Sequence, residues 1–496
     1  MLSTLVSFVL AMVIVSSLTG SRAFSVVQHM LAPLLAVPHA AAALGIAFLI
    51  APSGWIARAI SPWLTGWELP PDALVINDPG GWALIVGLIA KELPFLLLMT
   101  LAALPQTDAT RRILQTQTLG AGKTVSFLVA VLPSLYKQLR LPVYAVLAYS
   151  MTTVEMAMIL GPNLPPPLSV QIVVWMNEAS LANRGTAAGA ALFQLLAVIL
   201  AIGGWRISEW AIGAGFRYFV LRGLRARWLD IPGRALGIVF GLGFSAFLFL
   251  GLAGLAVWSF AVMWPFPQAW PSDLSAKTWM QTGAVLFERT RDTFLIAVWS
   301  ASVALALVLA CLEAEHRYQL VPNPFASAVL YLPLIIPQIG FLPGLQLFAL
   351  WFGLDGTRVA VAAVHLIFVL PYVYLSLSGP FRSVDPRLGL VAASLGATPR
   401  RAFWAIRLPV LLRPILTAFA VGLAVSIGQY LPTLLTGGGR VVTLTTEAVA
   451  LSSGGNRRII GAYGLAQSLL PVLGFALALI IPNLVFRNRR DLQTKT

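Results

Sequence analysis

Charged side chains are scarce in this sequence. Only 10% of its 496 residues are Asp, Glu, Lys or Arg, whereas 58% are hydrophobic. An average soluble domain has about 25% charged residues, because a surface in contact with water needs them. The composition therefore excludes a soluble protein and indicates a chain whose apolar side chains face lipid.

Cysteine and histidine are also rare, and their rarity excludes several kinds of chemistry. The single cysteine, Cys311, cannot form an internal disulfide, and the four scattered histidines do not match the ligand spacing of a zinc site. No Ser-His-Asp order with the spacing of a hydrolase is present either. We therefore expect no metal site, no cofactor in this chain and no catalysed reaction.

Long apolar windows are what the sequence does contain. Eleven of them have about the 20 residues that a helix needs to cross the hydrocarbon core of a membrane. They are residues 2–19, 31–51, 80–104, 141–160, 186–204, 236–261, 291–311, 325–352, 357–380, 412–436 and 464–486. Backbone groups in lipid must be hydrogen-bonded within their own segment. The sequence therefore predicts an all-α, multi-pass membrane protein with about 11 transmembrane helices.

Basic residues gather on one side of these predicted spans. If the C-terminal tail with Arg487, Arg489, Arg490 and Lys495 lies in the cytoplasm, the six loops on that side hold 23 of the 33 Lys and Arg residues. Such a bias is typical of cytoplasmic loops in membrane proteins. It accounts for the net charge of +15 without nucleic acid as a partner, and it predicts a cytoplasmic C-terminus.

Two stretches of the sequence repeat at a nearly constant distance. The matching pairs include Asp108 with Asp385, Phe127 with Phe403, and Gly161 with Gly437. An even number of spans separates the copies, so both cross the membrane in the same direction, unlike an inverted repeat. We expect a first module at 1–205, a basic cytoplasmic linker at 206–235 and a second module at 236–496. Helix 236–261 of the second module has no counterpart in the first.

Each copy contains a polar loop, at 108–140 and at 381–411, that is predicted to lie in the cytoplasm. The spacing of apolar residues predicts a short helix, a glycine bend and a second short helix that ends at proline. In both loops a glycine precedes a Leu-Pro pair by twelve positions. These residues are Gly120 with Leu132 and Pro133, and Gly396 with Leu408 and Pro409.

This pattern resembles the coupling loop of permease subunits in binding-protein-dependent ABC importers. Two such loops in one chain resemble a fused pair of parallel permease modules of the type I importer fold, as in thiamine and ferric-ion importers and in YnjC-type permeases. The resemblance covers nearly the whole chain and implies that both loops dock on an ATPase. The positions concerned are Leu114, Leu119, Gly120, Ala121, Phe127, Leu132, Pro133, Leu390, Ala392, Leu395, Gly396, Ala397, Phe403, Leu408 and Pro409.

One position departs from the family pattern. The glutamate that characterises the loop is replaced by Leu114 and Leu390, so we expect docking through shape and apolar contact. The stretch Gly122-Lys123-Thr124 is similar to the end of a phosphate-binding loop, but the earlier glycine of that motif is missing. We therefore expect ATP hydrolysis on a separate subunit.

Polar residues inside the predicted spans are candidates for a transport path. An ionised side chain in the middle of a membrane costs at least about 2.5 kcal/mol, so such residues avoid lipid. One hypothesis is that they line or gate a water-accessible path; the other is a structural ion pair, such as Lys91 with Glu155, plus polar contacts between helices. An ion-coupled secondary transporter using Lys91, Glu92 and Glu155 remains an alternative function. The candidates are Lys91, Glu92, Glu155, His365 and Gln429.

The resemblance as a whole implies a pore in the bacterial inner membrane. A dimeric ATPase would bind its cytoplasmic side, and a two-lobed periplasmic solute-binding protein would dock on the outward loops 161–185 and 437–463. The pore would move a small solute by alternating access. The Trp-rich segment 258–279 is predicted to be an aromatic belt at the membrane surface.

Overall fold

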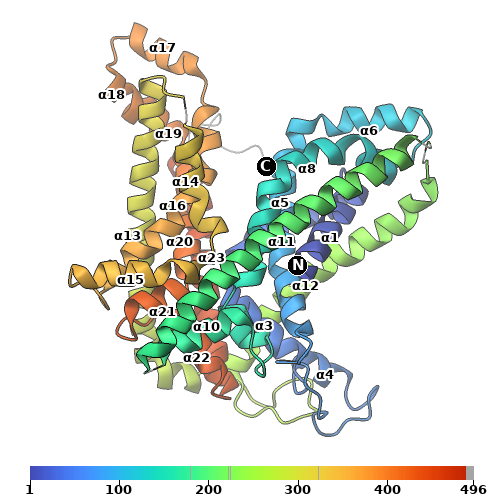
Figure 1. The fold of residues 1–496 in the computed structure, drawn as a ribbon, viewed down its shortest axis with the longest axis vertical. Helices are drawn as coiled ribbons and strands as arrows, with labels where there is room; N and C mark the ends of the chain where they lie inside the picture. The colour runs from blue at the N-terminus through green and yellow to red at the C-terminus, as the bar shows by residue number, and fades with distance from the viewer. Residues whose placement is uncertain (179, 222, 224, 322, 488–496) are drawn as a thin grey trace.

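The computed structural model describes residues 1–487 apart from residues 179, 222, 224 and 322 (Figure 1). Within these ranges the regular elements are helices, and one isolated β-bridge joins Ala261 to Leu274. The all-α prediction is therefore confirmed.

The helices divide into two sets along the chain. The first set is α1 (Leu2–Leu18), α2 (Arg22–Ala36), α3 (His39–Ile50), α4 (Trp55–Ile60), α5 (Trp82–Ala103), α6 (Ala109–Thr118), α7 (Lys123–Ser126), α8 (Leu132–Thr152), α9 (Glu155–Leu160), α10 (Leu168–Asn177) and α11 (Leu181–Leu221). The second set is α12 (Asp230–Phe260), α13 (Lys277–Arg317), α14 (Pro324–Ile335), α15 (Leu342–Trp351), α16 (Arg358–Arg382), α17 (Pro386–Ser394), α18 (Pro399–Ala402), α19 (Leu408–Val410), α20 (Leu412–Ile427), α21 (Leu431–Gly437), α22 (Leu444–Ser452) and α23 (Arg457–Val485). Shorter 3-10 turns are η1 (Leu104–Thr107), η3 (Arg227–Leu229) and η4 (Gln338–Gly340), while η2 (Phe127–Val131) and η5 (Phe403–Arg407) are π-helical.

Seven helical stretches among the described residues are long and apolar enough to cross a membrane. They are His39–Ile60, Trp82–Thr107, Ala182–Tyr218, Arg227–Phe260, Lys277–Arg317, Arg358–Arg382 and Arg457–Val485. An eighth results if Pro399–Val410 and Leu412–Ile427, which meet at 72°, form one bent span. Since α1 is apolar but has only 17 residues, the number of eleven spans stays a prediction.

Several windows that the sequence predicts as single spans are broken. Window 31–51 divides at Val37-Pro38 between α2 and α3, and window 325–352 divides at Ile336-Pro337 after α14. Proline lacks the N–H that would continue a helix, and the residue before it avoids the helical conformation. Windows 141–160 and 412–436 break just before Glu155 and Leu431. Each break frees backbone groups that need partners inside the membrane.

The sequence repeat is also a structural repeat. α5 and α16 begin 276 residues apart, at Trp82 and Arg358, and the same shift relates the starts of α7 and α18, α9 and α21, α10 and α22, and α11 and α23. The two π-helical segments keep it as well (403 − 127 = 276). Because helices far from the polar loops obey the shift, the two halves share one architecture from α5 and α16 onward.

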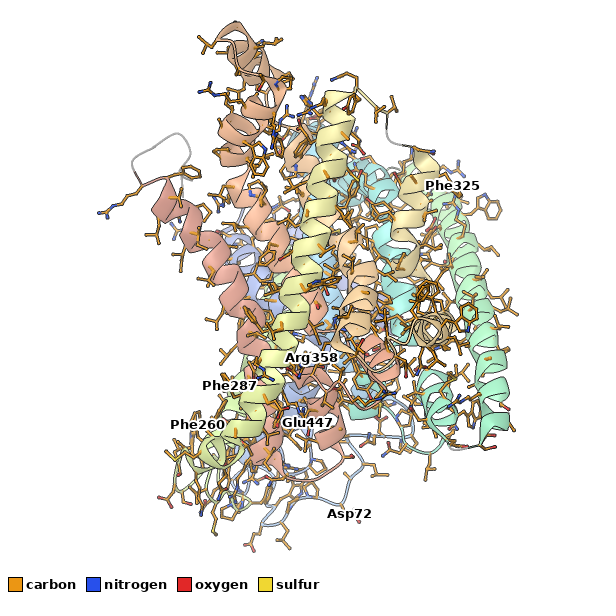
Figure 2. All side chains as sticks on the ribbon, turned by 90° about the vertical axis from the view of Figure 1, so that its left-hand side faces the viewer. Asp72, Phe260, Phe287, Phe325, Arg358 and Glu447 are labelled. Carbon is orange, nitrogen blue, oxygen red and sulfur yellow. The ribbon has the colours of Figure 1, made fainter. Side chains whose placement is uncertain are left out.

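The two polar loops lie toward the same end of the molecule. In Figure 1, α17 and α18 stand at the top and α6 at the upper right, whereas α4, α10 and α22 lie at the bottom. Figure 2 places Asp72, Phe260 and Glu447 at the bottom too, and we call this the outer end. The predicted outward loops 161–185 and 437–463 contain α10 and α22, so they belong to the outer end.

Buried apolar side chains join the two halves away from the polar loops. The largest cluster includes residues of both halves, from Leu34 to Tyr463. Nearer the loops the halves have separate clusters, one reaching from Leu10 to Trp205 and the other from Ala304 to Ala418. The halves thus share one cluster toward the outer end, whereas beneath the loops each half has its own cluster of buried residues, and α12 side chains such as Ile238 and Phe240 pack against that of the first half.

Helix α12 packs against both halves. It contacts α1, α2 and α3, and it also contacts α23. Glycines permit this close approach: a Cβ on Gly251 would lie 3.0 Å from the carbonyl carbon of Gly45 in α3. Gly237 meets Ser17 of α1, and Gly461 of α23 meets the α12 backbone, in the same manner. Small residues allow helices to pack closely in lipid, so α12 fastens the second half to the first.

Two tryptophans of the Trp-rich segment lie inside the protein, and the aromatic belt stays a prediction. Trp258 and Trp264 are buried, and the Arg58 guanidinium lies 5.5 and 5.0 Å from their ring centroids. Arg457 of α23 lies over Trp258 at 5.2 Å. A guanidinium over the face of an aromatic ring is attracted to it, which favours the burial of these tryptophans. The sequence could not show this contact, because both arginines are distant from the tryptophans along the chain.

Candidate functional site

Each polar loop folds into two short helices joined at a glycine. We name residues 108–133 elbow 1 and residues 385–409 elbow 2. α6 meets α7 near Gly120, whose φ is +93°, and α17 meets α18 near Gly396, whose φ is +77°. Glycine adopts this conformation readily, whereas other residues are strained in it. The prediction of a helix, a glycine bend and a second helix is therefore confirmed.

The second helix of each elbow does not end at proline, contrary to the prediction. The chain passes through the π-helical segments η2 and η5 into helices whose second residues are Pro133 and Pro409. A π turn widens the helix, which makes room for a proline ring that would otherwise meet the carbonyl four residues earlier. Phe127 begins η2 and is 1% exposed, so it anchors elbow 1 in the core.

Both elbows present an apolar and basic surface. Leu114 and Leu390, at the position of the family glutamate, are 57% and 71% exposed. The leucines beside the bends, Leu119 and Leu395, are 73% and 81% exposed. No Asp or Glu occurs in residues 109–140 or 386–412. A docking partner would therefore offer apolar area and tolerate or complement positive charge.

An ion pair attaches elbow 2 to the end of α13. Arg407 Nη1 lies 2.8 Å from Glu313 Oε2. Just before the elbow, Arg382 at the end of α16 is paired in the same way, with its Nη2 2.8 Å from Glu315 Oε2 of α13. The Arg407 and Glu313 side chains are largely shielded from solvent. Elbow 2 is thereby held by the first long helix after α12.

The Gly122-Lys123-Thr124 stretch of elbow 1 binds a carboxylate of its own chain. The N–H groups of Lys123 and Thr124 donate to Asp230 Oδ2 and Oδ1, both at 2.9 Å. The amides that a phosphate-binding loop would offer to a nucleotide are thus engaged. The Lys123 ammonium donates to the Thr19 carbonyl at 2.7 Å, and burial, followed by the charge of Arg234, lowers the pKa of Lys123.

Asp230, which makes this contact, is not among the residues that the sequence singled out. An acidic residue two positions before Pro232 is a signal for the start of a helix. The sequence could not show that the carboxylate would bond to amides more than 100 residues earlier, because that contact depends on how α12 packs.

Lys91 and Glu92 of α5 have separate partners inside the molecule. The Lys91 ammonium donates to the carbonyls of Leu34 and Val37, at 3.1 and 2.6 Å, where α2 ends. The Glu92 carboxylate accepts from the hydroxyls of two α1 serines, Ser3 and Ser7, at 3.3 and 3.2 Å. The predicted ion pair of Lys91 with Glu155 is wrong for the described structure, because the helix break supplies carbonyl acceptors that the sequence did not reveal.

Glu155 lies beside a contact between the two halves. It begins α9, is partly buried and accepts from the Tyr149 hydroxyl at 3.2 Å. One turn later, Met158 accepts from the Tyr430 hydroxyl of the second half at 3.3 Å. Gln429, the residue before Tyr430, is also partly buried. Glu155 and Gln429 therefore flank the contact between Met158 and Tyr430.

His365 is enclosed in the second half. It is 1% exposed, and its ring nitrogens lie 2.8 and 2.9 Å from the hydroxyls of Ser426 and Thr433. These contacts join α16 to α20 and α21. Among the described residues, no group of three or more His, Cys, Asp or Glu side chains could hold a metal ion.

Comparison with known proteins agrees with this geometry. The family model described as "Binding-protein-dependent transport system inner membrane component" matches residues 302–492. The inner membrane ABC transporter permease protein YnjC of Escherichia coli is 33% identical over 465 residues, which cover 93% of this chain and 82% of that protein. The molybdenum transport system permease protein ModB of Mycobacterium tuberculosis is 27% identical over 227 residues, 43% of this chain and 78% of that protein. The putative 2-aminoethylphosphonate transport system permease protein PhnV of Salmonella typhimurium is 25% identical over 236 residues, 46% and 87% of the two chains. The chain therefore belongs to the family of inner membrane permease components of binding-protein-dependent ABC transporters, which are transport pores and not enzymes.

Proposed function

We propose that this chain supplies both permease modules of an ATP-driven importer for a small solute. The observation that carries the proposal is the pair of elbows, which share one fold and lie toward the same end of the molecule (Figure 1). One elbow would seat in each subunit of an ATPase dimer. Their exposed leucines provide the apolar contact, and shape replaces the missing glutamate.

The arrangement of buried clusters supports transport by alternating access. Toward the outer end one cluster joins both halves, while beneath the elbows the buried residues form one cluster in each half, with α12 packed against the cluster of the first. This packing is what we expect of a pore that is closed to the outside. When ATP closes the ATPase dimer, the elbows approach one another, the halves rotate and the outer end opens.

The proposed orientation places the elbows in the cytoplasm and the outer end in the periplasm. A solute-binding protein would contact loops 161–185 and 437–463, and the C-terminus would be cytoplasmic. Part of the basic tail that supports this orientation, with Arg489, Arg490 and Lys495, lies outside the described residues.

Glu155 and Gln429 are the residues that we assign to the solute path. Both are partly exposed and flank the contact of Met158 with Tyr430 between the halves. Lys91, Glu92 and His365 are buried and hydrogen-bonded within their own halves, which favours a role in joining helices. The same contacts weaken the ion-coupled alternative, because Lys91 and Glu92 already have partners.

The solute itself is selected by the binding protein in this proposal. Relatives are named for molybdenum transport and for 2-aminoethylphosphonate transport, so one permease architecture accompanies chemically different cargo. The path residues of this chain would then only need to let the solute pass, because the binding protein would recognise it.

Crosslinking to co-purified subunits tests the proposal. The full chain, with Cys311→Ser and either Leu119→Cys or Leu395→Cys, is purified from its native membrane in mild detergent. Both exposed elbow positions should crosslink to an ATPase, and Trp270→Cys at the outer end, 63% exposed, is the matched control. Uptake into vesicles that contain this chain alone, driven by an ion gradient, would instead establish the secondary transporter.

A further inference from the structure

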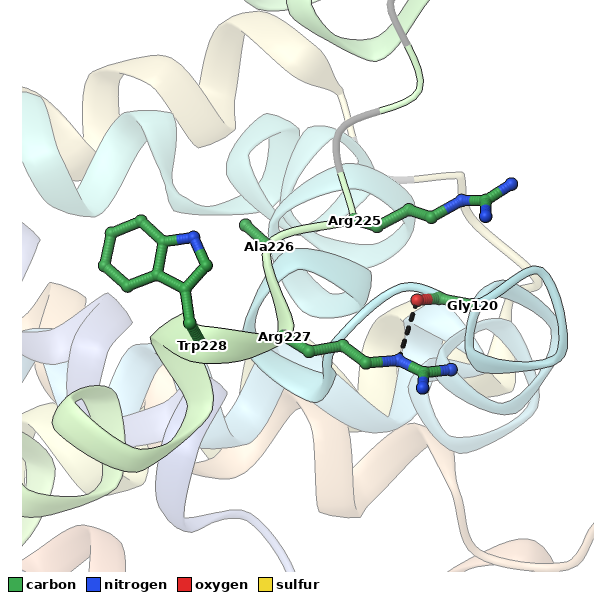
Figure 3. Close-up of a pocket in the computed structure, with 5 residues that line it drawn as sticks. All are labelled: Gly120, Arg225, Ala226, Arg227 and Trp228. Atoms are coloured by element: carbon green, nitrogen blue, oxygen red, sulfur yellow. Dashed lines mark hydrogen bonds between the residues drawn. The ribbon is translucent and has the colours of Figure 1, made fainter.

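The segment that joins the two halves is bonded to the bend of elbow 1. Arg227 Nε donates to the Gly120 carbonyl at 2.9 Å (Figure 3). The N–H of Gly122 donates to the Arg225 carbonyl, also at 2.9 Å. We name residues 225–230 the strut. These two bonds hold the strut against elbow 1. A shallow hollow of about 600 Å³ lies at this contact and is lined by Gly120 and the strut residues 225–228.

Asp230 completes this contact at the end of the strut. Its carboxylate accepts from the first two N–H groups of α7, as described above, and such charge-assisted bonds are stronger than neutral ones. A Cβ at Gly122 would lie 2.8 Å from Asp230 Oδ2 and 3.0 Å from the Arg227 Cα. The strut therefore lies directly against the elbow backbone, and a Cβ at Gly122 would require the strut to shift.

Elbow 2 is free of such a strut in the described part of the chain. A Cβ at Gly396 would meet no atom within 4 Å, whereas one at Gly120 would meet Arg225 at 3.5 Å. The acidic residue at the start of α17, Asp385, bonds only locally, to the Arg387 N–H at 2.9 Å. The two elbows differ because the strut belongs to the segment that joins the halves. The chain passes from the first half to the second once, so one elbow contacts such a segment.

The strut leads without interruption into α12. This helix has 31 residues, which corresponds to a length of about 46 Å. It packs on α1, α2 and α3 and on α23 of the second half. A displacement of Asp230 would therefore be transmitted through α12 to helices of both halves.

We propose that the strut makes elbow 1 and α12 one rigid body, so that force received at elbow 1 passes through Asp230 to α12 and on to α23. The proposal rests on the function proposed above and names the route by which a single ATPase contact moves both halves. Elbow 2 acts first on its own half, through α13 and through α20, which follows it in the chain. Asp230 is a positioning residue, because it acts on the elbow and touches no solute.

Spin labels in the chain alone test whether the strut holds elbow 1. Leu119→Cys and Leu395→Cys give labels at equivalent, exposed positions of the two elbows, in a Cys311→Ser background and in lipid nanodiscs. We expect the label at position 119 to be less mobile than the label at position 395. Asp230→Ala should raise mobility at 119 to the level at 395 and leave 395 unchanged.

Two further variants keep this test decisive. Asp385→Ala removes the local carboxylate contact of elbow 2, and as the matched control it should affect only position 395. Arg227→Gln removes a strut bond from an exposed side chain, so it should loosen position 119 even if Asp230→Ala fails to fold. Unchanged mobility at 119 in a folded Asp230 or Arg227 variant overturns the proposal.

A reversible crosslink tests whether elbow 1 and α12 stay together during transport. A Cβ at Gly233 would lie 3.3 Å from Thr124 Oγ1, so Thr124→Cys with Gly233→Cys places two sulfurs within bonding reach. In the complex with its ATPase, we expect ATP hydrolysis and uptake to stay within about twofold of the reduced protein. Loss of uptake on oxidation, restored by reductant, overturns the proposal, because it shows that the elbow must leave α12. Failure to bind any ATPase would contradict the proposed function and leave the spin-label result standing.

Discussion

Gly45 of α3 and Gly251 of α12 lie back to back, so closely that a Cβ on Gly45 would come within 2.9 Å of the Gly251 carbonyl carbon. The contact joins the first half to the helix that leads into the second. Since the atoms nearby are backbone atoms, a larger side chain cannot be accommodated by a rotamer change. The separation of α3 and α12 therefore depends on these two glycines.

We expect Gly251→Val to destabilise the protein by about 1–3 kcal/mol through overpacking. The apparent melting temperature in detergent should fall accordingly. Gly243→Val is the matched control, because Gly243 lies in the same helix with no other atom within 4 Å of its Cβ position. An equal fall in both variants would attribute the effect to helix propensity and not to the contact with α3.

The bend of elbow 2 depends on the conformation of Gly396. Its φ of +77° costs a residue with a Cβ about 1–2 kcal/mol, although space for the methyl group is available. We expect Gly396→Ala to speed hydrogen exchange in elbow 2 and to weaken ATPase binding.

The control for this variant lies in the same elbow. Gly389 is in the interior of α17, where alanine is favoured by about 1 kcal/mol, so Gly389→Ala should slow exchange or leave it unchanged. Identical behaviour of the two variants would show that the bend does not need a left-handed residue.

Lys91 supplies donors to the end of α2 in the membrane interior. Lys91→Met keeps a long side chain but leaves the carbonyls of Leu34 and Val37 without their donor, which costs about 1–3 kcal/mol. We expect a lower melting temperature in detergent. Lys277→Met, at an exposed site at the start of α13, should leave the melting temperature unchanged. A variant at Lys91 that keeps its stability but loses ion-driven uptake would support the secondary transporter instead.

The elbows could be predicted from the sequence because their signals are local. Gly120 and Gly396 each stand at a fixed distance from a Leu-Pro pair, and the same spacing occurs twice. The broken windows had a local signal too, since Pro38 and Pro337 stand at the breaks. The breaks were not predicted, because each apolar window is long enough to be interpreted as one continuous span.

The packing of α12 could not be predicted in this way. Apolar helix faces in a membrane are nearly interchangeable, so the partner is chosen by close fit, as between Gly45 and Gly251, and not by hydrophobic pattern. The bonds of Asp230 to elbow 1 depend on that packing. The partners of Lys91 were hidden for a related reason, because backbone carbonyls become acceptors only where a helix breaks.

Glu155 provides the sharpest test of the proposed solute path. Its carboxylate accepts from the Tyr149 hydroxyl at 3.2 Å and stands one turn before Met158, which touches Tyr430 of the opposite half. We expect Glu155→Gln to lower uptake about tenfold, equivalent to about 1.4 kcal/mol, because glutamine still accepts from Tyr149 but lacks the charge. The melting temperature should not change, since the hydrogen bond and the volume are kept.

A second variant separates path from packing. Tyr149→Phe removes only the hydroxyl that bonds Glu155, so it should disturb packing around α9 while leaving the carboxylate in place. If Glu155→Gln and Tyr149→Phe lowered uptake and melting temperature in parallel, Glu155 would be a structural residue. Loss of uptake in Glu155→Gln without loss of stability, and with ATPase binding unchanged, would instead support a place for the carboxylate on the solute path, because Glu155 would then act neither through the fold nor through the docked ATPase.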